Sequence, residues 1–264
     1  MPLIDLTLFG TVDKVGVAIQ RLRDYEPDEG YYVAYSGGKD STAILELAKM
    51  AGVKYDAHYN LPTVDPPEVV RFIRLQEEIA IERPEHTMWE LILRHHIPPL
   101  RNIRYCCEEL KEHGGTGRTV VTGIRWAESN RRKRTREMIE GCNIYDRITL
   151  NPIIDWTERE VWQFIRSRHL PYCSLYDEGF KRLGCILCPM GRRRQRLQQA
   201  DRWPKYYAQY VRTFDRMLED RAVRAGKASF TGRDDEAGQD VMDWWLSDNP
   251  RVPEAQMALE MGEV

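Results

Sequence analysis

The sequence predicts an α/β protein built on a doubly wound, mainly parallel sheet, with helices on both faces and a helical C-terminal extension. Short uncharged runs of β-branched and aromatic residues alternate with segments whose apolar residues have helical spacing, the pattern of repeated strand–helix units. The first such run, residues 31–35, ends at a glycine pair, and a helical pattern begins directly after it. With 264 residues, 42% of them hydrophobic, the chain has enough apolar material for one large domain with an appendage.

The individual elements follow from the same patterns. Strands are expected at 31–35, 53–59 and 119–124. Helices are expected at 12–23, 41–50, 67–79 and 156–166, and through most of the chain beyond residue 200. Thr157 and Glu160 have the spacing of a capping box at the start of the fourth of these helices. The polar, glycine-interrupted stretch 224–240 predicts a surface loop.

The charge balance excludes several classes of protein. Lys and Arg number 39 against 41 Asp and Glu, a net charge of −2, so any contact with nucleic acid must come from local basic patches. No apolar run approaches the roughly 18 residues of a membrane-spanning helix, and we expect no membrane association. Residues 1–8 lack a basic segment and do not resemble a signal peptide, so we expect a cytoplasmic protein with reduced cysteines.

The segment from Ser36 to Ser41, with the sequence SGGKDS, predicts an anion-binding loop. It lies between a strand and a helix, where backbone N–H groups have no intrahelical partner and glycines let an anion approach the backbone. The two serine hydroxyls add donors, Lys39 adds a positive charge, and Asp40 is a candidate magnesium ligand. The spacing differs from the phosphate loop G-x-x-x-x-G-K-[ST]. The alternative is an ordinary strand–helix turn with a solvent-facing lysine.

The cysteines indicate metal or redox chemistry. They are Cys106, Cys107, Cys142, Cys173, Cys185 and Cys188. Disulfides are not expected, because cysteines stay reduced in the cytoplasm. The alternative to metal or redox chemistry is that these cysteines are apolar residues of the core. Cys185 and Cys188 form a C-x-x-C pair, a spacing that zinc, iron–sulfur clusters and dithiol chemistry share. Cys142 has no partner close in sequence and is expected to be a bystander.

Several motifs together resemble the adenine nucleotide α-hydrolase-like superfamily, whose PP-loop has the form SGGKDS, and within it the branch related to sulfate reductases. Besides the loop, the resemblance is carried by segments 63–68 (TVDPPE), 122–129 (TGIRWAES), 151–157 (NPIIDWT) and 176–189. It covers roughly residues 30–190, with the motifs in the family's order. The branch comprises phosphoadenylyl and adenylyl sulfate reductases and the ATP pyrophosphatase component of DNA phosphorothioation systems.

This resemblance implies an enzyme that binds ATP and magnesium and cleaves the α–β bond. It assigns the phosphates or pyrophosphate to Ser36, Gly37, Gly38, Lys39, Asp40 and Ser41, and the rest of the nucleotide to Tyr59, Asn60, Gly123 and Arg125. The implied catalytic residues are Lys39, Asp40 and Arg125. The residues alone also favour Arg125, because it follows the C-terminal end of an expected strand, where open α/β sheets bind ligands.

The pair Cys106-Cys107 with a distant C-x-x-C is similar to the iron–sulfur signature of adenylyl sulfate reductases. We therefore favour a [4Fe–4S] cluster over zinc. The expected ligands are Cys107, Cys185, Cys188 and, as the fourth, Cys173. Cys106 is the alternative to Cys173, because adjacent residues that ligate one cubane would strain the backbone between them. A cluster with three ligands and one open iron is a further alternative.

The resulting functional hypothesis is an ATP pyrophosphatase that adenylylates a substrate for sulfur transfer, with DNA phosphorothioation as a candidate. DNA and a sulfur-relay protein of the cysteine desulfurase kind are the implied partners. Sulfonucleotide reductases typically carry a catalytic cysteine in a C-terminal tail, whereas no cysteine follows Cys188. The alternative is a sulfonucleotide reductase that takes its thiol from Cys142 or from a partner. A third hypothesis is a non-catalytic accessory protein that binds nucleotide and nucleic acid.

Two basic segments flank the expected chemistry, at 131–136 and 192–196. They are candidates for contact with nucleic-acid phosphates, with nucleotide binding and solvated helix faces as the alternatives. Trp244 and Trp245 are interpreted as helix-packing residues rather than as a base-stacking platform. Along the chain we expect an N-terminal helical segment (1–25), a nucleotide-binding domain with the iron–sulfur segment (26–195) and a helical C-terminal extension (196–264).

Overall fold

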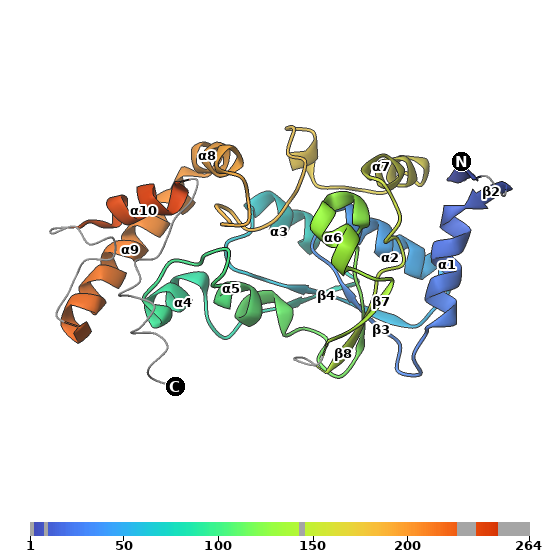
Figure 1. Cartoon of the computed structure of the whole chain (residues 1–264), viewed down its shortest axis with the longest axis horizontal. Helices are drawn as coiled ribbons and strands as arrows, with labels where there is room; N and C mark the ends of the chain where they lie inside the picture. The colour runs from blue at the N-terminus through green and yellow to red at the C-terminus, as the bar shows by residue number, and fades with distance from the viewer. Residues whose placement is uncertain (1–2, 8–9, 143–145, 226–235, 248–264) are drawn as a thin grey trace. The chain divides into compact units, whose positions relative to one another are not determined.

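The structure, a computed structural model, describes residues 3–7, 10–142, 146–225 and 236–247, and these fall into two compact units (Figure 1). Unit 1 comprises Met1–Leu61, Pro66–Arg83 and His113–Gly184, and unit 2 comprises Pro62–Asp65, Pro84–Glu112 and Cys185–Val264. The units are therefore interleaved along the chain, whereas the sequence suggested three consecutive segments. The difference arises because the connection between two strands of the sheet contributes its helices to unit 2.

Unit 1 is built on a six-stranded sheet with the strand order β5–β4–β3–β6–β8–β7. Its strands are β3 (Tyr31–Ala34), β4 (Tyr55–Asn60), β5 (Ile79–Glu82), β6 (Thr119–Val121), β7 (Ile139–Cys142) and β8 (Arg147–Leu150). All neighbouring pairs are parallel except β7 and β8, which are antiparallel. A separate antiparallel pair is formed by β1 (Ile4–Thr7) and β2 (Gly10–Asp13). The mainly parallel sheet with its helices confirms the predicted fold class.

The helices of unit 1 are α1 (Lys14–Asp24), α2 (Lys39–Ala51), α3 (Pro67–Arg74), α6 (Asn130–Thr135) and α7 (Glu158–Ser167). Helix α2 contacts both α1 and α7, and the three lie beside one another in Figure 1. Most of its residues are buried, including Ala43, Ile44, Leu47 and Ala48, because neighbouring elements surround it on several sides. Its N-terminus, directly after β3, is therefore held by a well-packed helix.

One predicted helix is shorter than expected, and one predicted cap is confirmed. The helix expected at 67–79 ends at Arg74, and Ile79 begins β5 instead. The chain turns tightly between them, since the amide of Ile79 donates to the carbonyl of Gln76 at 3.1 Å.

Helix α7 has the predicted capping box, in which the Glu160 amide donates to Thr157 Oγ1 and the Thr157 amide donates to Glu160 Oε2.

Unit 2 is mostly helical, as the sequence predicted for the C-terminal part of the chain. Its helices are α4 (Met88–His95), α5 (Tyr105–Cys107), a short π-helix (Glu108–Glu112), α8 (Arg193–Arg202), α9 (Pro204–Ala225) and α10 (Gly238–Leu246). Its core includes Trp245, Tyr210 and Phe214, whose ring centroids lie 5.0 to 6.0 Å apart, so the packing role of Trp245 is confirmed. Most of the expected loop at 224–240 lies outside the described residues. Among the helices that the structure describes, none is long and apolar enough to cross a membrane.

Candidate functional site

The predicted anion-binding loop joins β3 to α2 and is ordered by its own serines. Gly37 has φ +68°, and a Cβ there would lie 3.0 Å from Ile73, so only glycine fits without strain. Ser41 Oγ accepts from the Ser36 amide at 3.2 Å and donates to the Gly38 carbonyl at 2.9 Å. Ser41 therefore shapes the loop from a buried position, whereas Ser36 is exposed and its hydroxyl is hydrogen-bonded to that of Ser41 at 3.2 Å.

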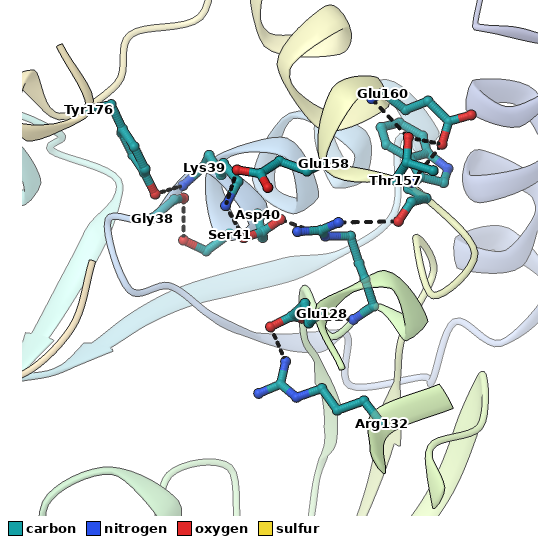
Figure 2. A network of polar contacts seen from close by, with 12 residues as sticks. Gly38, Lys39, Asp40, Ser41, Glu128, Arg132, Thr157, Glu158, Glu160 and Tyr176 are labelled. Carbon is teal, nitrogen blue, oxygen red and sulfur yellow. Dashed lines mark hydrogen bonds and ion pairs between the residues drawn. The ribbon is translucent and has the colours of Figure 1, made fainter. Parts of the chain in front are cut away.

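Asp40 links the two positive charges of the site (Figure 2). Its Oδ1 accepts from Arg125 Nε at 2.7 Å, and its Oδ2 lies 3.3 Å from Lys39 Nζ. Both cationic side chains are almost fully buried, 4% exposed for Arg125 and 6% for Lys39. Buried charges require such pairing, because their desolvation is otherwise costly. Since both carboxylate oxygens already face cations, the arrangement does not favour Asp40 as a magnesium ligand.

Arg125 reaches Asp40 from the segment that follows β6. Its Nη1 donates to the Trp156 carbonyl at 3.2 Å, and its own amide donates to Glu128 Oε1 at 3.0 Å. Gly123, two residues earlier, is where this segment meets α2: a Cβ there would lie 2.9 Å from the Asp40 Cβ. The structure thus places Gly123 and Arg125 beside the loop, as predicted, but the guanidinium is paired within the protein.

The two residues predicted to lie along the adenosine occur at the end of β4. Tyr59 is 2% exposed, so almost none of it is accessible to a ligand in this conformation. Asn60 is partly exposed, and its Nδ2 donates to Tyr32 Oη at 3.2 Å. Both residues stay predictions as nucleotide contacts.

Tyr176 and Glu158 are two neighbours of the loop that received no role from the sequence. The backbone amide of Lys39 donates to Tyr176 Oη at 2.9 Å, and Glu158 Oε1 lies 4.0 Å from Lys39 Nζ (Figure 2). Tyr176 lies 137 residues from Lys39 in sequence, so no local pattern could have joined them. Glu158 begins α7, where an acidic residue is also expected simply to complement the helix dipole.

Four cysteines belong to unit 2. Cys106 and Cys107 form part of α5, and Cys185 and Cys188 lie in the turn before α8. The thiol of Cys106 is hydrogen-bonded to Cys107, and this bond, with Arg104 and Lys111, lowers the pKa of Cys107 to about 6 despite burial. The pKa of Cys106 is raised by the same hydrogen bond, by burial and by the charges of the other three thiols. The four thiols therefore lie within electrostatic reach of one another.

Lys111 and Asp65 add charge beside the same cysteines. Desolvation raises the pKa of Cys185, and the hydrogen-bonded ammonium of Lys111 opposes the increase. Lys111 Nζ also lies 3.7 Å from Asp65 Oδ1. Desolvation alone would lower the pKa of Lys111, but the charges of Asp65 and Cys185 outweigh it and raise that pKa.

The donor set suits an iron–sulfur cluster, but its geometry is not that of an assembled metal site. No group of three or more His, Cys, Asp or Glu side chains among the described residues is arranged to hold a metal ion. Cys173 belongs to unit 1, where it is 1% exposed and its electrostatic neighbours are Glu68, Asp177 and Glu178. The shared environment of the other four thiols favours Cys106 over Cys173 as the fourth ligand. The backbone of Cys142 lies in β7, in the other unit from the four thiols, and its side chain is outside the described residues.

Two polar side chains of α8 hold the backbone of the turn between Cys185 and Cys188. Leu187 has φ +62°, a conformation that non-glycine residues rarely adopt. Its amide donates to Gln199 Oε1 at 2.8 Å, and its carbonyl accepts from Arg196 Nε at 3.2 Å. Arg196 is 3% exposed and stacks 4.4 Å from the Trp245 ring, so the inclusion of Arg196 in a surface basic patch was wrong.

The other basic segment contributes exposed cations on α6. Helix α6 carries Arg131, Lys133 and Arg134, which are exposed and make no ion pair with the residues that the structure describes. We call these three residues the α6 basic surface. Glu128 connects it to the site, because it accepts from the Arg125 amide and forms an ion pair with Arg132 (Figure 2).

A mainly parallel sheet with a glycine-rich loop at the start of a buried helix defines an α/β protein, and open sheets of this class bind ligands at the carboxyl ends of their strands. The family model described as the phosphoadenosine phosphosulfate reductase domain matches residues 30–191. The chain belongs to this family, and the predicted sulfate-reductase-like branch is thereby confirmed at the level of the family.

Individual relatives are similar at low identity. An uncharacterised protein of Methanocaldococcus jannaschii is 30% identical over 190 residues, which cover 67% of this chain and 46% of that protein. The chain thus spans about half the length of this relative. An adenosine 5'-phosphosulfate reductase of Staphylococcus epidermidis is 28% identical over 177 residues, 62% of this chain and 71% of that protein. The crystal structure of a phosphoadenylyl-sulfate reductase from Candida auris, a phosphate complex, has a TM-score of 0.50 at 19% identity and covers 64% of this chain and 87% of that one, which shows a shared fold.

We predict that Asp40→Asn destabilises the protein by about 1–3 kcal/mol, because it leaves the buried Arg125 without its anion. Urea unfolding followed by circular dichroism measures the change. Glu46→Gln is the matched control, since it removes a carboxylate on the same helix whose partner, Arg168, is 48% exposed; it should cost less than about 1 kcal/mol. Equal effects of the two substitutions would contradict the role given to Asp40.

Proposed function

We propose that the chain is a nucleotide enzyme whose loop, Ser36 to Ser41, binds the polyphosphate of ATP and prepares the α–β bond for cleavage. One arrangement carries the proposal: the first amides of α2, the buried ammonium of Lys39 and the Asp40–Arg125 pair meet where β3 and β6 end. Helix N-termini with glycine-rich approaches are anion sites, and a buried positive charge strengthens such a site. Membership of the phosphoadenosine phosphosulfate reductase domain family supports the same site.

The proposed reaction is adenylyl transfer. A nucleophilic oxygen of the acceptor attacks the α-phosphorus, the bond from that phosphorus to the α–β bridging oxygen breaks, and pyrophosphate leaves with the electron pair. The loop amides and Lys39 stabilise the negative charge that develops on the leaving group. Asp40 and Arg125 position Lys39 and the start of α2. Because Asp40 already faces two cations, the magnesium ion that accompanies ATP would be held by the phosphates and by water rather than by Asp40.

The adenylylated acceptor would then receive sulfur: the outer sulfur of a persulfide attacks the activated phosphorus, AMP leaves, and a thiol reductant cleaves the S–S bond that still joins the sulfur to its donor. Unit 2 carries the cysteines proposed for this step. Cys106, Cys107, Cys185 and Cys188 are the proposed ligands of a [4Fe–4S] cluster, a choice supported by their common electrostatic environment. When bound, such a cluster supplies sulfur or electron-transfer chemistry. Lys111 places a positive charge next to the proposed ligand Cys185, which compensates part of the negative charge of the thiolates. The proposed sulfur source is a relay protein of the cysteine desulfurase kind.

A second candidate is sulfonucleotide reduction. It is favoured by the similarity to adenosine 5'-phosphosulfate reductases, of which the chain covers 71% in the Staphylococcus epidermidis protein. The same loop would then hold the phosphosulfate, and a thiol would attack its sulfur. In this second candidate the nucleophilic thiol would come from Cys142 or from a partner, because residues 189–264 contain no cysteine.

DNA is the proposed sulfur acceptor, and the α6 basic surface is its proposed contact. The three exposed cations share helix α6 with Arg132, whose ion pair with Glu128 connects the helix to the segment that carries Arg125. Trp126, in the short 3-10 helix that precedes α6, is 37% exposed, and exposed aromatic rings beside cations are typical of single-stranded nucleic-acid sites. Cationic side chains of this kind bind phosphates without reading sequence.

The first test is product analysis with labelled ATP. We expect pyrophosphate and an adenylylated product, and we expect Lys39→Ala to lower kcat/KM at least about 100-fold, because it removes charge stabilisation of the leaving group. Lys49→Ala is the control on the same helix, since Lys49 pairs with Glu78 at the surface. Sulfite from adenylyl sulfate with thioredoxin would support the second candidate. Nucleotide binding without either product would indicate an accessory protein instead.

The second test concerns the cluster and uses iron and sulfide content after anaerobic purification. Cys106→Ser and Cys185→Ser should each lower the iron bound per chain, whereas Cys173→Ala should leave it unchanged. The visible absorption spectrum provides an independent measure of the cluster. A colourless protein that contains zinc, or an equal loss of iron in Cys173→Ala, would refute the proposed ligand set.

The third test measures DNA binding against salt concentration. Reversal of the three charges of the α6 basic surface to Glu should weaken binding and reduce the slope of log K against log salt by about 2–3, because each phosphate contact contributes about 0.9. The control reverses three other exposed cations of unit 1, Arg71, Arg74 and Arg83. Unchanged binding in the first variant, or equal weakening in both, would exclude the surface as the contact.

A further inference from the structure

Tyr176 presents a hydroxyl group at the first turn of α2. The Lys39 amide, one of the N–H groups that the loop offers to an anion, donates to Tyr176 Oη at 2.9 Å. A Cβ on Gly38 would lie 3.6 Å from the same oxygen. The hydroxyl is therefore in contact with the part of the loop where the phosphates are proposed to bind, and the residue remains partly exposed.

The phenolic proton of Tyr176 is available to a ligand. The hydroxyl oxygen accepts one hydrogen bond, and among the residues that the structure describes none accepts a hydrogen bond from it. Burial raises the pKa of Tyr176, and the nearby carboxylate of Asp40 raises it further, against the opposing effect of the Lys39 amide. The hydroxyl therefore stays protonated at neutral pH and can act as a donor.

Aromatic packing fixes the direction of this hydroxyl. Trp162 and Tyr172 meet the Tyr176 ring edge to face, with centroids 4.9 and 6.4 Å away, and Lys39 Nζ lies 5.8 Å from its centroid. Rings held in this way lose little additional freedom when a ligand binds. The position of the oxygen is thus set by the ring packing and is not only a consequence of the bond to Lys39.

We propose that Tyr176 is a ligand-binding residue of the loop: its hydroxyl accepts the hydrogen bond from the Lys39 amide and donates a hydrogen bond to a non-bridging oxygen of the bound pyrophosphate group. This inference rests on the proposed function, because it requires the loop to hold that group. The chain of two hydrogen bonds polarises the hydroxyl and strengthens its bond to an anion. It also makes the segment that contains Tyr176 part of the anion site, although this segment is far from the loop in sequence.

The test compares Tyr176→Phe with the wild-type protein by isothermal titration with inorganic pyrophosphate, ATP and AMP. The variant keeps the ring packing and loses the donor, so we expect roughly tenfold or more weaker binding of pyrophosphate and ATP. AMP lacks the pyrophosphate group and should bind equally to both proteins. Tyr172→Phe is the matched control: its hydroxyl bonds to Asp177 at 3.1 Å, so its loss should leave all three affinities unchanged.

Three outcomes would overturn the inference: unchanged pyrophosphate affinity in Tyr176→Phe, an equal loss for AMP, or tighter binding of pyrophosphate. Tighter binding would mean that the hydroxyl competes with the anion for the Lys39 amide. Thermal unfolding without ligand checks that the variant is folded. The proposed function fails separately: if ATP yields no pyrophosphate but Tyr176→Phe still weakens pyrophosphate binding, the role of Tyr176 stands and adenylyl transfer does not.

Discussion

The carboxylate of Asp40 is the interaction on which the candidate site depends. It faces Arg125 and Lys39 at once, and neither cation has enough solvent exposure to be hydrated. Without Asp40, two buried positive charges would lie near each other at a helix N-terminus, where the helix dipole also disfavours them. Gly123 permits this arrangement, because any side chain there would collide with Asp40. The loop after β6 and the start of α2 are therefore held together at the proposed anion site.

In unit 2, polar side chains likewise stabilise the backbone next to the cysteines. The turn between Cys185 and Cys188 contains a left-handed leucine, Leu187, which costs conformational energy. Arg196 and Gln199 compensate for that cost by binding the leucine's carbonyl and amide from α8. In both units, buried polar side chains thus fix a short backbone segment whose conformation the chain would not adopt alone.

The sequence predicted those parts of the molecule that depend on local patterns. β3, α2, the turn between them and the capping box of α7 follow from residue spacing within single segments, and all are confirmed. The anion-binding role of the loop stays a prediction. Ile79 was assigned to a helix because its apolar spacing suits either element, and only pairing with β4 makes it a strand residue. Tyr176 was missed as a loop contact, and Arg196 was assigned to the surface, because both depend on packing against distant segments. Arg196 also illustrates that a run of arginines does not reveal which member is buried.

The central claim is that the amides at the start of α2 hold the polyphosphate of a nucleotide. A crystal structure of the protein with magnesium and a non-hydrolysable ATP analogue tests it most directly. The account predicts phosphate oxygens within hydrogen-bond distance of the Gly38, Asp40 and Ser41 amides, with the Asp40–Arg125 pair intact. A nucleotide bound elsewhere, with the Ser36–Ser41 loop in contact only with the protein, would contradict it.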